Sequence, residues 1–181
     1  MTVKNKHLIY LTGFMGSGKT TVGPILANTL GYSFIDIDQE IERISGRRIP
    51  ELFSMEGETG FRRIEHEALM TASRSAECIV SLGGGTIATD ENIAVIVASG
   101  ILIYLKADLD QIVKRLRNKT NRPLILSPDG STLPEPLLRE RITQLLALRE
   151  PYYARADIVI STDDRRVGLT IDEIVRQVSR Y

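Results

Sequence analysis

Residues 13–20 read Gly-Phe-Met-Gly-Ser-Gly-Lys-Thr. This stretch matches the phosphate-binding pattern G-x-x-x-x-G-K-[ST] at every defined position, between an apolar run at 8–11 and a helical pattern at 19–30. The glycines let the backbone curl until successive N–H groups point at phosphate oxygens, and the dipole of the following helix attracts anions. The expected nucleotide-binding residues of this loop are Gly16, Ser17, Gly18, Lys19, Thr20 and Thr21.

Two side chains of the loop suit particular parts of a nucleotide. Lys19 can reach the β- and γ-phosphates, and the hydroxyl of Thr20 can ligate Mg²⁺. We therefore predict a bound nucleotide with Mg²⁺.

Short apolar runs alternate with helical patterns along the rest of the chain. Strands are expected at 8–11, 33–36, 78–82, 101–105 and 157–160. Helices are expected at 19–30, 38–44, 49–73, 90–98, 108–117, 136–153 and 170–179. This alternation is typical of a parallel sheet covered on both faces, with ligands bound at the carboxyl edge. We predict one α/β domain over 1–181, a three-layer fold around a five-stranded parallel sheet.

Two segments exceed the minimal alternation of strands and helices. Residues 38–73 are mostly helical in pattern and are long enough to form a helical insert that binds the substrate. Residues 118–135 lack periodicity and are rich in Asn, Pro, Ser, Asp and Gly. Long irregular loops in compact domains are uncommon and often close over a site, so we predict a mobile lid here.

Composition excludes several classes of protein. The 181 residues are 43% hydrophobic and 25% charged, and 23 basic residues balance 23 acidic ones. This neutral balance argues against broad nucleic-acid or membrane binding, because both need a basic excess. The single cysteine, Cys78, excludes an internal disulfide and a cysteine-based zinc site. With no secretory or membrane-spanning pattern apparent, we expect a cytoplasmic protein.

A phosphate-binding loop alone does not distinguish a kinase from a hydrolase. A switch GTPase needs an Asn-Lys-x-Asp segment, which the sequence lacks. Motor and chaperone ATPases usually carry an acidic pair at the end of the next buried strand, whereas the run at 78–82 leads into Gly83-Gly84-Gly85 without a carboxylate. This difference favours phosphoryl transfer to a bound acceptor over hydrolysis.

Charged residues near the expected sheet edge suit an anionic acceptor. Asp36 and Asp38 lie two apart in an extended segment and would face the same cleft, one toward water on Mg²⁺ and the other toward an acceptor hydroxyl. The alternative for Asp38 is a helix N-cap. Arg62 and Arg63 diverge by about 100° on a helix, so at most one points into the site. The alternative for Arg62 is a surface ion pair with a nearby glutamate.

Other residues also allow two interpretations. Gly83-Gly84-Gly85 permits close approach by a ligand, or forms a plain tight turn. Arg149 can bind an anionic acceptor, or interact with the carboxyl end of its helix. Arg122 lies in the expected lid and could neutralise charge on the phosphoryl group, while Arg115 adds positive charge nearby or is simply solvated.

Taken together, these segments resemble the shikimate kinase family. The likeness covers nearly the whole chain, through the motifs at 13–20, 34–38, 61–65, 82–85, 122–124 and 149–153. The resemblance implies an NMP-kinase-like fold and transfer of the γ-phosphoryl group of ATP to the 3-hydroxyl of shikimate, in aromatic amino acid biosynthesis. The expected partner is a small molecule, shikimate, with no nucleic acid and no membrane, and we expect a monomer.

The resemblance further implies roles for single residues. Asp38 would be the base for the hydroxyl, and Lys19 and Arg122 would stabilise the transferring phosphoryl group. Thr20 would bind Mg²⁺ directly and Asp36 through water. The expected acceptor-binding residues are Asp38, Arg62, Gly83, Gly84, Gly85 and Arg149. The expected nucleotide contacts outside the loop are Arg115, Arg122 and Arg166.

Two other functions fit the same sequence pattern. A gluconate-kinase-like enzyme for sugar acids would share the architecture and the phosphate loop. A regulatory protein that binds a nucleotide without any acceptor chemistry would share only the loop.

Overall fold

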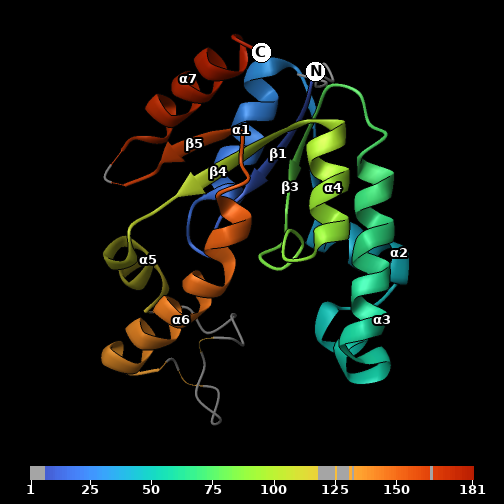
Figure 1. The fold of residues 1–181 in the computed structure, drawn as a ribbon, viewed down its shortest axis with the longest axis vertical. Helices are drawn as coiled ribbons and strands as arrows, with labels where there is room; N and C mark the ends of the chain where they lie inside the picture. The colour runs from blue at the N-terminus through green and yellow to red at the C-terminus, as the bar shows by residue number, and fades with distance from the viewer. Residues whose placement is uncertain (1–6, 118–124, 126–130, 132, 164) are drawn as a thin grey trace.

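A five-stranded parallel sheet forms the centre of the molecule, as predicted (Figure 1). The computed structural model describes residues 7–117, 125, 131, 133–163 and 165–181. The strands are β1 (Leu8–Thr12), β2 (Ser33–Asp36), β3 (Cys78–Ser81), β4 (Ile101–Lys106) and β5 (Ile158–Ser161). Their order is β2-β3-β1-β4-β5, so β2 and β3 lie on one side of β1 and the chain then crosses to β4 and β5 on the other side. Such a reversal point, at the carboxyl end of the central strand, is where ligands bind in open α/β sheets.

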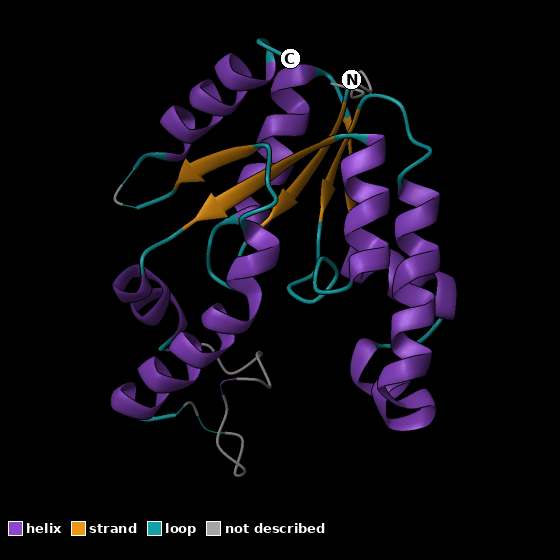
Figure 2. Ribbon diagram, in the orientation of Figure 1, coloured by secondary structure: helices purple, strands orange, loops and turns teal. Residues whose placement is uncertain are grey.

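Helices cover both faces of the sheet and complete the three layers (Figure 2). They are α1 (Lys19–Leu30), α2 (Ile37–Ser45), α3 (Ile49–Ala72), α4 (Asp90–Ser99), α5 (Leu109–Leu116), α6 (Glu135–Tyr153) and α7 (Val167–Val178). Alternate residues of β1 point to opposite faces. Ile9 and Leu11 pack with α1 and α7, whereas Leu8 and Tyr10 pack with α2, α3 and α4.

A third apolar cluster lies beyond the sheet edge. Phe14 of the phosphate loop packs there with buried residues of α5 and α6, among them Ile112, Leu138 and Ile142. The loop is therefore anchored to the sheet through β1, which it follows, and to α5 and α6 through Phe14. This packing fixes the position of the loop without occupying its inner surface.

The segment between β2 and β3 is helical, but its longer helix is kinked. The sequence predicts one continuous helix at 49–73, whereas Gly57 interrupts α3 with φ 66° and ψ −171°. Side chains disfavour this conformation and glycine does not. The helix therefore has two arms, one before and one after the kink.

Of the predicted lid at 118–135, residues 118–124, 126–130 and 132 lie outside the described residues. No helix within the described ranges has both the length and the apolar character needed to cross a membrane.

Candidate active site

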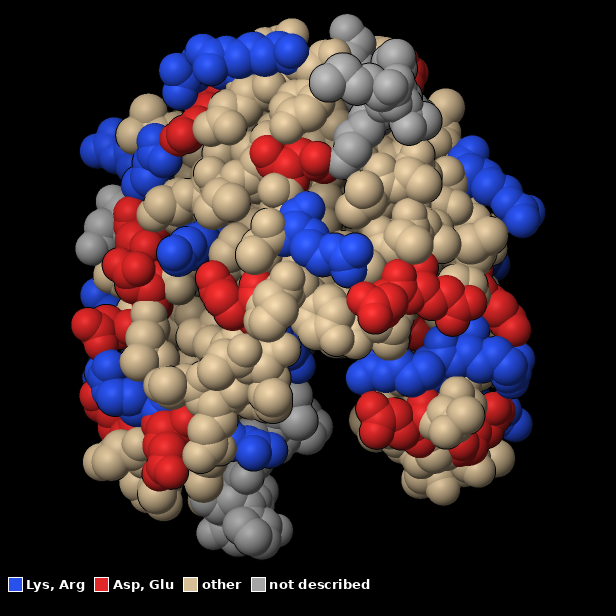
Figure 3. All heavy atoms as spheres, viewed as in Figure 1, with Lys and Arg blue, Asp and Glu red and all other residues tan. Residues whose placement is uncertain are grey.

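A cleft of about 1170 Å³ opens at the carboxyl edge of the sheet. Its walls come from the phosphate loop, the β2–α2 junction, α3, the turn after β3, α5, α6 and the β5–α7 loop. Figure 3 shows it as a hollow between two lobes, with basic and acidic side chains along its rim. Most small-molecule pockets are of this size or smaller, so the cleft can hold two ligands side by side.

The phosphate loop forms one side of the cleft. Gly16 and Gly18 have φ values of 82° and 104°, a region that glycine enters at no cost, and Gly18 caps α1. The Lys19 amine donates to the carbonyl oxygen of Gly13 at 2.6 Å. The Ser17 hydroxyl is buried and has no hydrogen-bond partner among the described residues. A phosphate oxygen would supply that partner.

Arg115 links the phosphate loop to the far end of the sheet. Its guanidinium donates to the carbonyl oxygens of Gly16, at 2.9 Å, and Thr162, at 2.8 Å. Arg166 is the N-cap residue of α7 and is exposed, whereas Arg165 lines the cleft. Arg165 is paired with Glu173, whose pKa this hydrogen bond lowers. The structure thus brings Arg165 rather than Arg166 to the nucleotide side.

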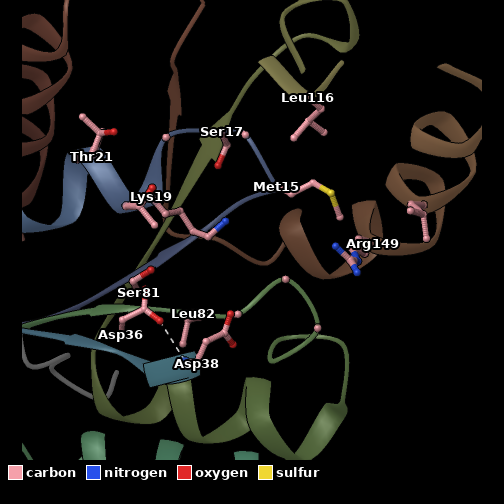
Figure 4. Close-up of a pocket in the computed structure, with 18 of the residues that line it drawn as sticks. Met15, Ser17, Lys19, Thr21, Asp36, Asp38, Ser81, Leu82, Leu116 and Arg149 are labelled. Atoms are coloured by element: carbon pink, nitrogen blue, oxygen red, sulfur yellow. Dashed lines mark hydrogen bonds between the residues drawn. The ribbon is translucent and has the colours of Figure 1, made fainter. Parts of the chain in front are cut away.

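Asp36 and Asp38 both line the cleft but do not share an extended segment. Asp36 ends β2, and its carboxylate accepts hydrogen bonds from the backbone N–H of Asp38 at 3.0 Å and of Gln39 at 3.4 Å. The N-cap of α2 is therefore Asp36, and Asp38 lies in the first helical turn. In Figure 4 the side chains of Asp38, Lys19 and Arg149 point toward the same space from three different elements.

The adjacent arginines of α3 point in different directions. Arg62 lines the cleft, and its guanidinium donates to Glu65 at 2.7 Å and to Glu58 at 3.4 Å. Arg63 is exposed and pairs with glutamates on the outer face of the helix. Arg62 is therefore ion-paired and also faces the cleft. Burial disfavours its charge, but the two glutamates outweigh this effect and raise its pKa.

Arg149 reaches the cleft from the opposite wall, on α6. Its guanidinium lies over the ring of Phe14, 5.4 Å from the ring centre. One of its terminal nitrogens, Nη1, is buried and has no hydrogen-bond partner among the described residues. This nitrogen lies against the backbone of Gly84 in the turn after β3, where a Cβ atom would come within 2.9 Å of it. The side chain is thus held in place with a donor left for a ligand.

The three consecutive glycines, residues 83–85, form what we term the glycine turn. They follow β3 and lie next to Asp38, Arg149 and Arg62 respectively. The predicted lid arginine, Arg122, lies outside the described residues.

The sequence model of one family matches residues 15–179, and that family is shikimate kinase. The chain belongs to the shikimate kinase family. A protein named shikimate kinase from Chlorobium phaeobacteroides is 46% identical over 179 residues, covering 99% of this chain and 94% of the relative. The resemblance of the sequence motifs to this family is confirmed.

Solved structures show the same relationship. A shikimate kinase from Acinetobacter baumannii, solved in complex with shikimate, is 33% identical with a TM-score of 0.84, covering 96% of this chain and 93% of that one. A gluconokinase from Sinorhizobium meliloti 1021 is 18% identical with a TM-score of 0.61, covering 98% and 94%. The second likeness shows the fold alone, so the fold does not separate the two kinds of acceptor.

This member of the shikimate kinase family has a buried polar network behind Arg62. Glu65 is buried, and its second carboxylate oxygen accepts a hydrogen bond from the Thr86 hydroxyl at 2.8 Å. The backbone carbonyl of Thr86 in turn accepts from the Asn92 side chain at 2.8 Å, and Asn92 contacts the His66 ring at 2.7 Å. His66, on α3, is therefore part of the network.

Sequence reasoning missed most of this network. The spacing of Arg62 and Glu65, three residues apart on a helix, predicts contact between them. Thr86 and Asn92 carry no comparable signal, because their partners lie on other elements of the chain.

The residues expected to hold Mg²⁺ fit that ion. Thr20 and Asp36 both line the cleft beside the phosphate loop. Among the described residues, no three histidine, cysteine, aspartate or glutamate side chains gather closely enough to hold a metal ion by themselves. Mg²⁺ commonly binds one or two protein oxygens and completes its shell with phosphates and water. One hydroxyl and one carboxylate are therefore a sufficient donor set.

Proposed function

We propose that this chain transfers the γ-phosphoryl group of ATP to the 3-hydroxyl of shikimate, releasing ADP and shikimate 3-phosphate. One observation carries the proposal: a phosphate loop faces two arginines and an aspartate across a single cleft, in a member of the shikimate kinase family. The reaction belongs to aromatic amino acid biosynthesis.

The acceptor side is suited to a carboxylate. Arg62 and Arg149 approach the glycine turn from different walls of the cleft. A carboxylate between them would accept charge-assisted hydrogen bonds from both guanidinium groups. It would also satisfy the buried nitrogen of Arg149, and a buried donor without a partner costs about 1–3 kcal/mol. We assign carboxylate binding to these two arginines, with the backbone of the glycine turn beside them.

Asp38 is the residue we assign as base. It lies next to the glycine turn and lines the cleft, so it can accept the proton of the acceptor hydroxyl. That oxygen then forms a bond to the γ-phosphorus as the bond from phosphorus to the β–γ bridging oxygen breaks, and ADP leaves. Lys19 would stabilise the charge on the phosphoryl oxygens, and we propose the same for Arg122.

We further propose that Thr20 binds Mg²⁺ directly and that Asp36 binds it through water. When bound, Mg²⁺ neutralises charge on the β- and γ-phosphates. Asp36 also caps α2, so the same carboxylate holds the backbone of Asp38 in place. Its second oxygen is left to orient a water molecule.

For the base of ATP we propose a site between Arg115 and the β5–α7 loop, with Arg165 in the position expected for Arg166. Arg165 and Thr162 line the cleft, and Arg115 joins the phosphate loop to this region. A planar guanidinium can stack on a purine ring.

We propose that the protein works as a monomer in the cytoplasm. The one cysteine, Cys78, is buried and has no second cysteine to pair with, which fits a reducing compartment where ATP is available.

Product analysis of the purified protein tests the proposed reaction. Incubation with ATP and shikimate should give a single phosphorylated product, which NMR identifies by coupling of phosphorus to the proton at carbon 3. Asp38→Asn should lower kcat by about 10²-fold or more, because the base is lost, while ATP binding by calorimetry stays the same. ATP binding without any transfer by the wild-type protein would support a regulatory protein instead.

A further inference from the structure

The glycine turn does not need glycine for its backbone angles. Gly83, Gly84 and Gly85 are absent from the glycines with positive φ in the described part of the chain. The turn is closed by a hydrogen bond from the Thr86 N–H to the Gly83 carbonyl at 3.2 Å, which any residue could form. The reason for three glycines must therefore lie in what surrounds them.

Each glycine of the turn lies against one functional side chain. A Cβ atom on Gly83 would lie 2.5 Å from an Asp38 carboxylate oxygen. One on Gly84 would lie 2.9 Å from Nη1 of Arg149, and one on Gly85 would lie 2.8 Å from Nη1 of Arg62. All three distances are too short for a carbon atom, so even a methyl group would force a movement.

The atoms that would have to move at the glycine turn differ from those at Gly100. A Cβ on Gly100 would lie 2.3 Å from the backbone oxygen of Leu8, and the core strand cannot retreat. At the glycine turn the nearest atoms are the ends of flexible side chains, which can rotate away. Substitution there should leave the fold intact and displace the side chain that performs the chemistry.

We propose that the glycine turn is a positioning element in which each glycine sets the place of one side chain. Gly83 places Asp38, Gly84 places Arg149, and Gly85 places Arg62. This rests on the proposed function and adds to it a separate role for each glycine, beyond close approach of the acceptor to the backbone. A Cβ atom on Gly83 would also lie 2.9 Å from the Thr86 hydroxyl oxygen. A substitution of Gly83 should therefore disturb the network behind Arg62 as well.

The three positions should differ in their kinetic effects. Gly84→Ala and Gly85→Ala should raise the KM for shikimate at least about tenfold and leave the KM for ATP unchanged, since each moves a carboxylate-binding arginine. Gly83→Ala should lower kcat, by about 10²-fold for a displacement of about 1 Å at the base. All three variants should melt within a few degrees of the wild type, because only the ends of flexible side chains are displaced.

Double-mutant cycles decide whether the glycines act through these side chains. The kcat/KM for shikimate is measured for Gly85→Ala alone, in an Arg62→Ala background and in an Arg149→Ala background. We expect the loss from Gly85→Ala to vanish in the Arg62→Ala background and to persist in the Arg149→Ala background. The loss from Gly84→Ala should instead vanish in the Arg149→Ala background and persist in the Arg62→Ala background.

Three results would overturn the positioning role. The first is a loss of kcat/KM that persists when the arginine beside the substituted glycine has been replaced by alanine, which means that the methyl group obstructs the acceptor directly. The second is unchanged kinetics in the single glycine variants. The third is a failure of these variants to fold. Turnover of shikimate by the wild-type protein in the same assay tests the proposed function separately, so the two ideas can fail independently.

Discussion

At the scale of single residues, Arg62 combines an ion pair within its helix with a position at the cleft where we propose that it binds the acceptor. Its pairing with Glu65 at 2.7 Å fixes the guanidinium, and its position beside Gly85 keeps one edge of it at the cleft. The sequence predicts that only one of two adjacent arginines faces the site, and helix geometry suffices for that. It does not predict which partner holds the arginine, because Thr86 supports Glu65 from another element.

Arg62→Lys should raise the KM for shikimate by about 10–100-fold with a much smaller change in kcat, because an ammonium group cannot replace a two-pronged guanidinium. Steady-state kinetics at saturating ATP measure this. Arg63→Lys is the matched control, since Arg63 lies one residue along and points outward. An unchanged KM in Arg62→Lys would remove Arg62 from the binding site.

Thr86→Val should weaken the support of Arg62 from behind. The buried Glu65 carboxylate loses a hydrogen-bond donor, which should cost about 1–3 kcal/mol of unfolding free energy and raise the KM for shikimate several-fold. Thr86→Ser keeps the hydroxyl and should restore both values toward those of the wild type. If Thr86→Ser shows the same KM as Thr86→Val, the hydroxyl has no part in positioning Arg62.

At the scale of elements, apolar runs and helical periodicity predict all five strands and the helices to within a few residues. The deviations have local causes. The sequence pattern of a helix continues through Gly57, but the backbone there leaves the helical region. Asp36 rather than Asp38 caps α2, because the helix begins one residue earlier than its apolar pattern suggests.

Substitution by alanine should change the stability of the protein in opposite directions at two glycines, Gly100 between α4 and β4 and Gly168 in α7. Gly100→Ala should lower the free energy of unfolding by about 1–3 kcal/mol, because its methyl group would press on the backbone of β1. Gly168→Ala, near the start of α7 with no atom within 4 Å of its Cβ position, should raise it by about 0.5–1 kcal/mol. Urea denaturation measures the free energy of unfolding of both variants. A Gly168→Ala variant less stable than the wild type would contradict the expectation that the added methyl group meets no neighbouring atom.

At the scale of the whole molecule, the order of the strands brings the nucleotide and acceptor sides together. The phosphate loop follows β1, the glycine turn follows the adjacent strand β3, and Asp38 follows β2 at the edge of the sheet on the same side. Helix α6 brings Arg149 across the cleft, although it comes some 65 residues later than the glycine turn. The sequence motifs predict these participants, whereas their separate contacts with the three glycines depend on tertiary packing.

We propose that the protein transfers the γ-phosphoryl group of ATP to a carboxylated acceptor, shikimate, in this cleft. The most direct measurement is kcat/KM in an assay coupled to ADP release, with shikimate, its neutral methyl ester and gluconate as acceptors. We predict efficient turnover of shikimate, a loss of about 10²-fold or more for the ester because both arginines lose their partner, and little turnover of gluconate. Turnover of gluconate without turnover of shikimate would contradict the assignment of shikimate as the acceptor.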